Sequence, residues 1–107
     1  MTPELKAKFD ALIAETPVVV FMKGTKQFPQ CGFSARVVQA LSMLDVPFTD
    51  INVLDDWDVR EGIKEYSNWP TIPQVYIKGE FIGGSDIIID LLQSGELAQM
   101  VADIKAA

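Results

Sequence analysis

The sequence has no histidine and only one cysteine, Cys31, among its 107 residues. A lone thiol cannot close a disulfide within its own chain, so an internal disulfide framework is excluded. One thiolate alone also cannot hold a metal centre, because such centres take several ligands. If Cys31 is functional, the sulfur it lacks must therefore come from another molecule. A single cysteine also fits a reducing compartment.

Long apolar runs and an excess of positive charge are missing as well. No apolar stretch approaches the roughly 20 residues that span a bilayer, which argues against a membrane protein. The formal net charge of −6 argues against nucleic acid and anionic membranes, since both favour clustered Lys and Arg. The N-terminal stretch lacks a basic region followed by an apolar block, so we expect no signal peptide and a cytoplasmic location. A small molecule or another protein is then the expected partner.

The composition and patterning that are present predict one α/β domain over residues 1–107. Hydrophobic residues make up 49% of the chain, which is enough to bury a core, and no repeat or linker interrupts it. A first helix begins at Thr2 and ends before Pro17. The β-branched apolar run Val18–Met22 predicts a central strand covered on both faces. A second helix from Cys31 and a parallel strand over 47–53 follow.

The second half of the chain continues this alternation. Asp55 or Asp56 is expected to cap a third helix, and a β-hairpin with glycine in its turn is predicted over residues 74–82. Ser85 or Asp86 would then cap one last helix. The resulting order, αβαβαββα, gives a small mixed sheet with helices on both faces. The C-terminal part of the last helix is expected to present an apolar face of Leu97, Met100, Val101 and Ile104.

Cys31 stands between a polar loop, residues 23–30, and a predicted helix start. There the partial positive charge and unpaired N–H groups of the helix would stabilise a thiolate and lower its pKa from ~8.5 toward neutrality. The alternative is a buried cysteine that packs as a small hydrophobe, but its neighbours, among them Gln30 and Ser34, do not form an apolar environment. Ser34 occupies the place of a second thiol in a C-x-x-C pair. Any mixed disulfide on Cys31 must therefore be resolved by an external thiol.

Four motifs appear in order along the chain: Phe21-Met22-Lys23-Gly24-Thr25, Cys31-Gly32-Phe33-Ser34, Trp69-Pro70-Thr71-Ile72-Pro73-Gln74 and Gly83-Gly84-Ser85-Asp86. With these motifs the chain closely resembles the monothiol glutaredoxins of the CGFS type, from Leu5 to Lys105. The resemblance implies a thioredoxin-like (glutaredoxin) fold with a four-stranded mixed sheet and helices on both faces, as a single glutaredoxin domain. Some family members have a second cysteine at the position of Ser85, which can pair with the active-site thiol. That pairing is excluded here.

The resemblance also implies a glutathione site, to which several side chains are chemically suited. Lys23, at the end of the first strand, would meet a glutathione carboxylate and favour the Cys31 thiolate; otherwise it is a solvated lysine at a strand end. Arg60 would pair with a glutathione carboxylate from the third helix, where an arginine is otherwise a surface charge. Phe33 and Trp69, which are more often packing residues, are placed at the rim of the site.

Backbone groups would form the rest of this glutathione site. Thr71-Ile72-Pro73 resembles the family's cis-proline segment, although only ~5–6% of X–Pro bonds are cis in general. A cis bond would turn the backbone of Ile72 outward to pair with an extended peptide. Gly84 permits close approach of the backbone to a ligand. The helix N-terminus at Ser85 and Asp86 would bind an anionic end of the ligand, and the Asp86 carboxylate would bind an ammonium. The alternative is a helix cap without a ligand.

Three functions remain open from the sequence. The leading one, implied by the resemblance, is an iron–sulfur carrier that delivers clusters or senses cellular iron, in iron and redox homeostasis. A homodimer would bridge a 2Fe-2S cluster through Cys31 of each subunit and two glutathione thiols, completing the usual four sulfur ligands. Its partners would be apo iron–sulfur proteins and BolA-like proteins. The alternative is an enzyme that reduces protein–glutathione mixed disulfides, with Cys31 as nucleophile. A redox-inert adaptor is the third, and it leaves the glutathione groove unexplained.

Overall fold

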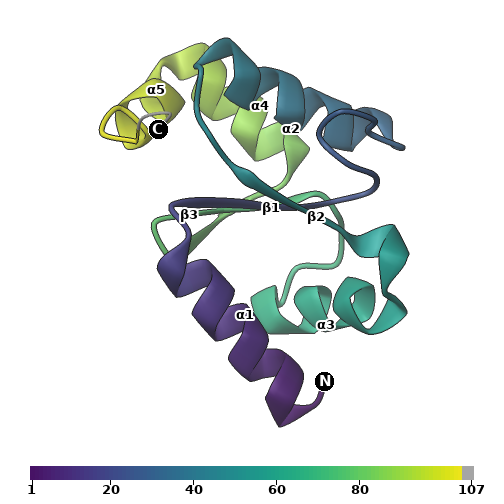
Figure 1. The fold of residues 1–107 in the computed structure, drawn as a ribbon. Coiled ribbons are helices and arrows are strands. Elements are labelled where there is room, and N and C mark those ends of the chain that lie inside the picture. Colours follow the sequence, from purple (N-terminus) through teal and green to yellow (C-terminus); the bar gives the residue numbers. More distant parts are fainter. Residues whose placement is uncertain (105–107) are drawn as a thin grey trace.

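Two layers of helices enclose a four-stranded mixed sheet in the computed structural model of the protein (Figure 1). The structure describes residues 1–104, so the last three residues of the predicted domain, 105–107, lie outside the described residues. Along the chain the elements are α1 (Pro3–Glu15), β1 (Val18–Met22), α2 (Gly32–Met43), β2 (Thr49–Asn52), the 3-10 helix η1 (Val53–Asp55), α3 (Trp57–Ser67), β3 (Gln74–Ile77), β4 (Glu80–Gly83), α4 (Ser85–Ser94) and α5 (Glu96–Met100).

The sheet has the strand order β2-β1-β3-β4, so β1 is central, as its apolar run predicts. β1 is parallel to β2 and antiparallel to β3, and β3 and β4 form the predicted hairpin. The register places Met22 beside Asn52 and Phe21 beside Gln74. As a result, the ends of β1, β2 and β4 and the beginning of β3 all meet at one edge of the sheet. Segments distant in sequence converge at this edge.

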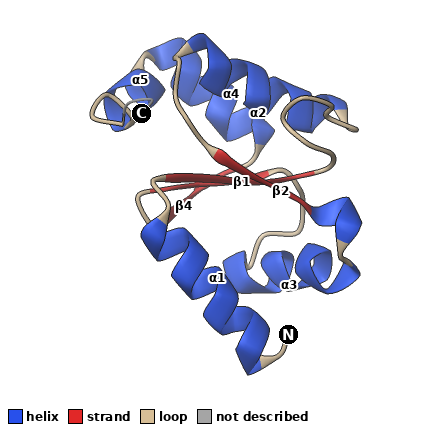
Figure 2. Ribbon diagram, in the orientation of Figure 1, coloured by secondary structure: helices blue, strands red, loops and turns tan. Residues whose placement is uncertain are grey.

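Helices cover both faces of the sheet, as Figure 2 shows: α2, α4 and α5 lie on one face and α1 and α3 on the other. β1 serves both layers because its side chains alternate in direction. Val18, Val20 and Met22 pack with the first group of helices, and Val19 and Phe21 with the second. All five are almost completely inaccessible to solvent. In the described part of the chain, no helix has the length and apolar character needed to cross a membrane.

Two of the predicted helix starts, those of α1 and α3, are capped by side chains, and the start of α2 is not. The Thr2 hydroxyl accepts a hydrogen bond from the Leu5 N–H at 3.1 Å, which caps α1. Of the two aspartates proposed for α3, Asp56 is the cap: its Oδ1 accepts from the N–H groups of Asp58 and Val59. The α2 cap position is occupied by Cys31 itself, with extended backbone and no side-chain capping bond.

Three predicted boundaries are wrong. The last helix is two helices, because Gly95 adopts a left-handed conformation (φ +85°) that ends α4. Neither Ser85 nor Asp86 caps α4: the cap residue is Gly84, and Ser85 is already the first helical residue. The strand predicted over 47–53 is only Thr49–Asn52, because the Asn52 side chain accepts a hydrogen bond from the Leu54 N–H and begins η1.

Candidate functional site

A cavity of about 490 Å³ lies where the strand ends converge. The loop after β1, the start of α2, one side of α3, the segment before β3 and the start of α4 all contribute to its wall. The lining includes all nine predicted site residues: Lys23, Cys31, Arg60, Thr71, Ile72, Pro73, Gly84, Ser85 and Asp86. The two predicted rim residues also line it, together with three that the sequence analysis did not single out: Lys64, Pro70 and Ile87.

Cys31 is half-buried at the N-terminus of α2 and opens onto the cavity. Hydrogen bonding from the backbone N–H of Ser34 lowers the pKa of the thiol most; the Phe33 N–H, the charge of Lys23 and the Ser34 hydroxyl act in the same direction, against desolvation. The expected thiolate stabilisation by a helix start is therefore present. The polarity of Ser34 was a misleading sign of exposure, because its side chain is fully buried and its Oγ accepts from the Lys23 N–H at 3.1 Å.

The loop between β1 and Cys31 is tied to the neighbouring strand by side chains. Asn52 Oδ1 accepts from the Gly24 N–H at 2.9 Å, in addition to its bond from η1. Asp50 Oδ2 accepts from the Lys26 N–H at 2.8 Å. Gly24 has φ +91°, and a Cβ there would lie 2.5 Å from a carbonyl oxygen of the same loop. These contacts fix the backbone that presents Lys23 and Cys31 to the cavity.

The segment before β3 contains the predicted cis peptide bond, between Ile72 and Pro73. No backbone hydrogen bond to another of the residues 1–104 involves Ile72, so its N–H and C=O are available to a ligand. Behind the segment lies Gln74, which is fully buried. Its Nε2 donates to the carbonyl oxygens of Trp69 at 3.1 Å and Thr71 at 3.2 Å. Gln74 therefore holds the turn that carries Ile72 at the wall of the cavity.

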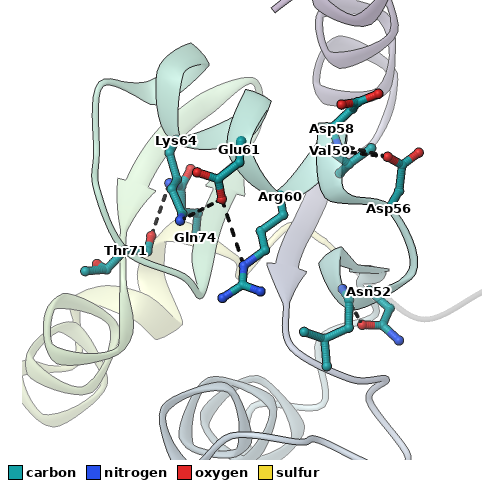
Figure 3. A network of polar contacts seen from close by, with 10 residues as sticks. Asn52, Asp56, Asp58, Val59, Arg60, Glu61, Lys64, Thr71 and Gln74 are labelled. Carbon is teal, nitrogen blue, oxygen red and sulfur yellow. Dashed lines mark hydrogen bonds and ion pairs between the residues drawn. The ribbon is translucent and has the colours of Figure 1, made fainter.

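Two cations from α3 form one end of the cavity. Arg60 and Lys64 are one helical turn apart, so both side chains project from the same side of the helix. Figure 3 shows Glu61 between them: its Oε2 accepts from Lys64 Nζ at 3.0 Å and lies 4.0 Å from Arg60 Nε. That second distance is too long for a hydrogen bond, and Arg60 Nε is buried without a partner among the described residues. The guanidinium also lies over the Trp57 ring, 5.5 Å from its centroid.

The start of α4 forms the opposite end of the cavity. The backbone approaches closely there, because a Cβ on Gly84 would lie 3.1 Å from the Pro73 carbonyl oxygen. Ser85 is 7% exposed and its Oγ has no hydrogen-bond partner within residues 1–104. Asp86 is exposed beside it. A helix N-terminus, an unpaired hydroxyl and a carboxylate thus face the same space, which suits a ligand end that carries both an anion and an ammonium.

Lys64 is the charged site residue that the sequence analysis missed. The signal was available: with Arg60 already assigned, helical spacing places a residue four positions later on the same side. Gln74 was noted only as part of a motif, because nothing in its type predicts that a polar side chain in a buried strand faces inward to bind loop carbonyls.

A 2Fe-2S cluster would find one fitting ligand in each chain, the Cys31 thiolate. In the described range, no group of three or more His, Cys, Asp or Glu side chains is arranged to hold a metal ion. Such a cluster normally takes four thiolates. The donor set therefore fits a cluster shared with a second chain and two external thiols, and does not fit a cluster held by one chain alone.

Comparison with known proteins identifies the family. The family model described as glutaredoxin matches residues 18–82. A curated relative from Synechocystis, named an uncharacterized monothiol glutaredoxin ycf64-like, is 62% identical over 101 residues, which cover 94% of each chain. The chloroplastic monothiol glutaredoxin-S14 of Arabidopsis thaliana is 54% identical over 94% of this chain, which spans 58% of that relative's length.

Solved structures agree with the fold. The solution structure of reduced poplar apo GrxS14 has a TM-score of 0.83 and 53% sequence identity, and the match covers 95% of this chain and 94% of that one. The crystal structure of a buckwheat glutaredoxin–glutathione complex has a TM-score of 0.84 and 25% identity, over 99% of this chain and 100% of the other. The thioredoxin-like fold expected from the sequence is thus confirmed, and the chain belongs to the glutaredoxin family as a monothiol glutaredoxin.

Proposed function

We propose that this monothiol glutaredoxin binds glutathione in the cavity beside Cys31 and uses it to carry a 2Fe-2S cluster between two copies of the chain. The observation that carries the proposal is the charge layout of the cavity. Glutathione has a carboxylate at each end, an ammonium beside one of them and a thiol in the middle. The cavity has cations at one end, a helix start with a carboxylate at the other, and the Cys31 thiol in its wall.

The two ends of glutathione are assigned by their chemistry. In the γ-glutamyl end the carboxylate and the ammonium are on one carbon, which matches the N–H groups at the start of α4 and the nearby carboxylate of Asp86. The glycine carboxylate then pairs with Lys23, Arg60 and the added cation, Lys64. Between them the peptide pairs with the backbone of Ile72, as an added strand does. Thr71, Pro73, Gly84 and Ser85 shape this path, because all four line the same cavity.

The cluster is the cargo of this carrier. Cys31 of each subunit and two glutathione thiols supply its four sulfur ligands, and the homodimer exists in the cluster-bound form. Because two of the four ligands are not tethered to the chain, release to an acceptor requires no unfolding of the protein. Apo iron–sulfur proteins are the proposed recipients, BolA-like proteins are proposed partners, and the cytoplasm is the proposed location. Residues 1–107 are proposed to form a single glutaredoxin domain.

Anaerobic reconstitution tests the carrier function. The protein is incubated with ferrous iron, sulfide and glutathione, and then analysed by absorption spectroscopy and gel filtration. A brown dimer with 2Fe-2S absorption is expected, and Cys31→Ser should remain colourless and monomeric. The matched control is Ser42→Cys in the Cys31→Ser background, which restores the thiol count on the exposed side of α2. A colourless wild-type monomer, or cluster formation by the control, contradicts the proposal.

The same thiol supports a second function, glutathione-dependent reduction of mixed disulfides. The lowered pKa of Cys31 favours attack by the thiolate on the glutathione sulfur of a glutathionylated protein, which leaves as a thiol. Free glutathione then attacks the mixed disulfide on Cys31, giving oxidised glutathione and the starting thiolate. Rapid turnover of a glutathionylated peptide by protein that forms no cluster would favour this reaction over the carrier function.

A further inference from the structure

Glu61 lies next to the cationic end of the cavity without lining the cavity itself. Its Oε2 accepts a hydrogen bond from Lys64 Nζ at 3.0 Å and is 4.0 Å from Arg60 Nε (Figure 3). Glu61 instead lines a neighbouring hollow between α1 and the start of α3. The carboxylate therefore approaches the two cations from outside the proposed glutathione site.

The two cations are engaged to different degrees. Lys64 has a hydrogen-bonded ion pair with Glu61, so a ligand carboxylate must either displace Glu61 or share the ammonium with it. Within the described residues, Arg60 has no hydrogen bond at Nε, although that atom is buried. Within residues 1–104 the guanidinium is paired with Glu61 only at 4.0 Å, whereas the Lys64 ammonium is hydrogen-bonded to it at 3.0 Å, so Arg60 is the less engaged of the two cations. A second negative charge brought to this end also meets the repulsion of the Glu61 carboxylate.

We propose that Glu61 is an internal competitor for the glycine carboxylate of glutathione, which weakens binding and makes the affinity dependent on salt. This inference rests on the proposed function and adds a residue that tunes it. Glu61 limits retention of a ligand that a carrier must release again. Because its side chain is 45% exposed, its effect is moderated by solvent and is screened at high ionic strength.

The test is calorimetric titration of the wild type and Glu61→Gln with reduced glutathione under anaerobic conditions. We expect Glu61→Gln to bind roughly 1.4- to 5-fold more tightly at low salt, the range given by exposed ion pairs. The gain should disappear near 1 M salt, where the Debye length is about 3 Å. Glu65→Gln is the matched control, because it removes the same charge from the same helix but pairs with the N-terminus, not with the site cations.

Binding of a glutathione ester shows whether the gain in affinity depends on the glycine carboxylate. The glycine ethyl ester of glutathione lacks the competing carboxylate, so Glu61→Gln and the wild type should bind it equally. Equal or weaker binding of glutathione by Glu61→Gln, with normal wild-type binding, overturns the inference alone and indicates that Glu61 positions the cations. A gain that persists with the ester also overturns it. Absence of glutathione binding by the wild type overturns the proposed function and this inference with it.

Discussion

Replacing Gln74 by leucine should destabilise the protein and disorder one wall of the site. The side chain is fully buried, and its amide donates to the carbonyl oxygens of Trp69 and Thr71. Leucine has nearly the same size but no donor. Each lost hydrogen bond is worth about 0.5–1.5 kcal/mol, and a buried carbonyl left without a partner costs about 1–3 kcal/mol. The two bonds to carbonyls are part-buried, and the buried Tyr76 hydroxyl also loses Gln74 Oε1 as its acceptor. With these three losses and some apolar gain from leucine, we expect a loss of about 2–4 kcal/mol in the free energy of unfolding.

Urea denaturation followed by circular dichroism measures this loss, and thermal melting checks it. At ~4 °C for each kcal/mol in a chain of this length, Tm should fall by about 8–16 °C. Gln93→Leu on the exposed surface of α4 is the control and should change stability by less than about 0.5 kcal/mol. In the folded Gln74→Leu protein, glutathione binding should also weaken. Equal stability of the two variants would refute the role given to Gln74.

Three further predictions follow from charges and backbone. Lys23→Met removes a cation that lowers the pKa of Cys31, so the midpoint of the pH profile for alkylation by iodoacetamide should move to higher pH. Burial is the main cause that raises the pKa of both Tyr66 and Tyr76 from 10.0 to about 12. The unfolded chain therefore loses these protons at lower pH than the folded protein, and the free energy of unfolding should fall between pH 10 and pH 12. Gly24→Ala should cost about 1–3 kcal/mol from the positive φ alone, measured by urea denaturation, and more because of the 2.5 Å contact.

Each of these predictions has an outcome that contradicts it. An unchanged alkylation midpoint would assign the lowered pKa of Cys31 to the hydrogen bonds from Ser34 and Phe33 alone. A free energy of unfolding that stays constant between pH 10 and pH 12 would contradict the tyrosine argument. For the glycine, Gly79→Ala is the control, because Gly79 has φ +84° and no atom of residues 1–104 lies within 4 Å of an added Cβ. If both variants lose the same stability, the close contact at Gly24 has no energetic effect.

The sequence predicted most of the sheet because the apolar run of β1 has only one stable location, between two helical layers. It missed the break at Gly95, since Leu97 continues the apolar pattern and the interruption depends on one backbone conformation. At the site, the family motifs identified the backbone walls, and the overall resemblance to the family identified Arg60. Lys64 stands in none of the four motifs, and Gln74 stands in one that gives its side chain no role. What each does depends on which side of α3 or β3 faces the cavity, and packing decides that.

The placement of the two tryptophans has a spectroscopic consequence. They are the only ones in the chain, and both adjoin the site: Trp69 lines the cavity, and Trp57 lies under the Arg60 guanidinium. The indole Nε1 of Trp69 is buried without a partner in the described structure. All indole emission of the protein therefore originates at or beside the site. Occupancy of the cavity can be followed by intrinsic fluorescence, without a label and at concentrations too low for calorimetry.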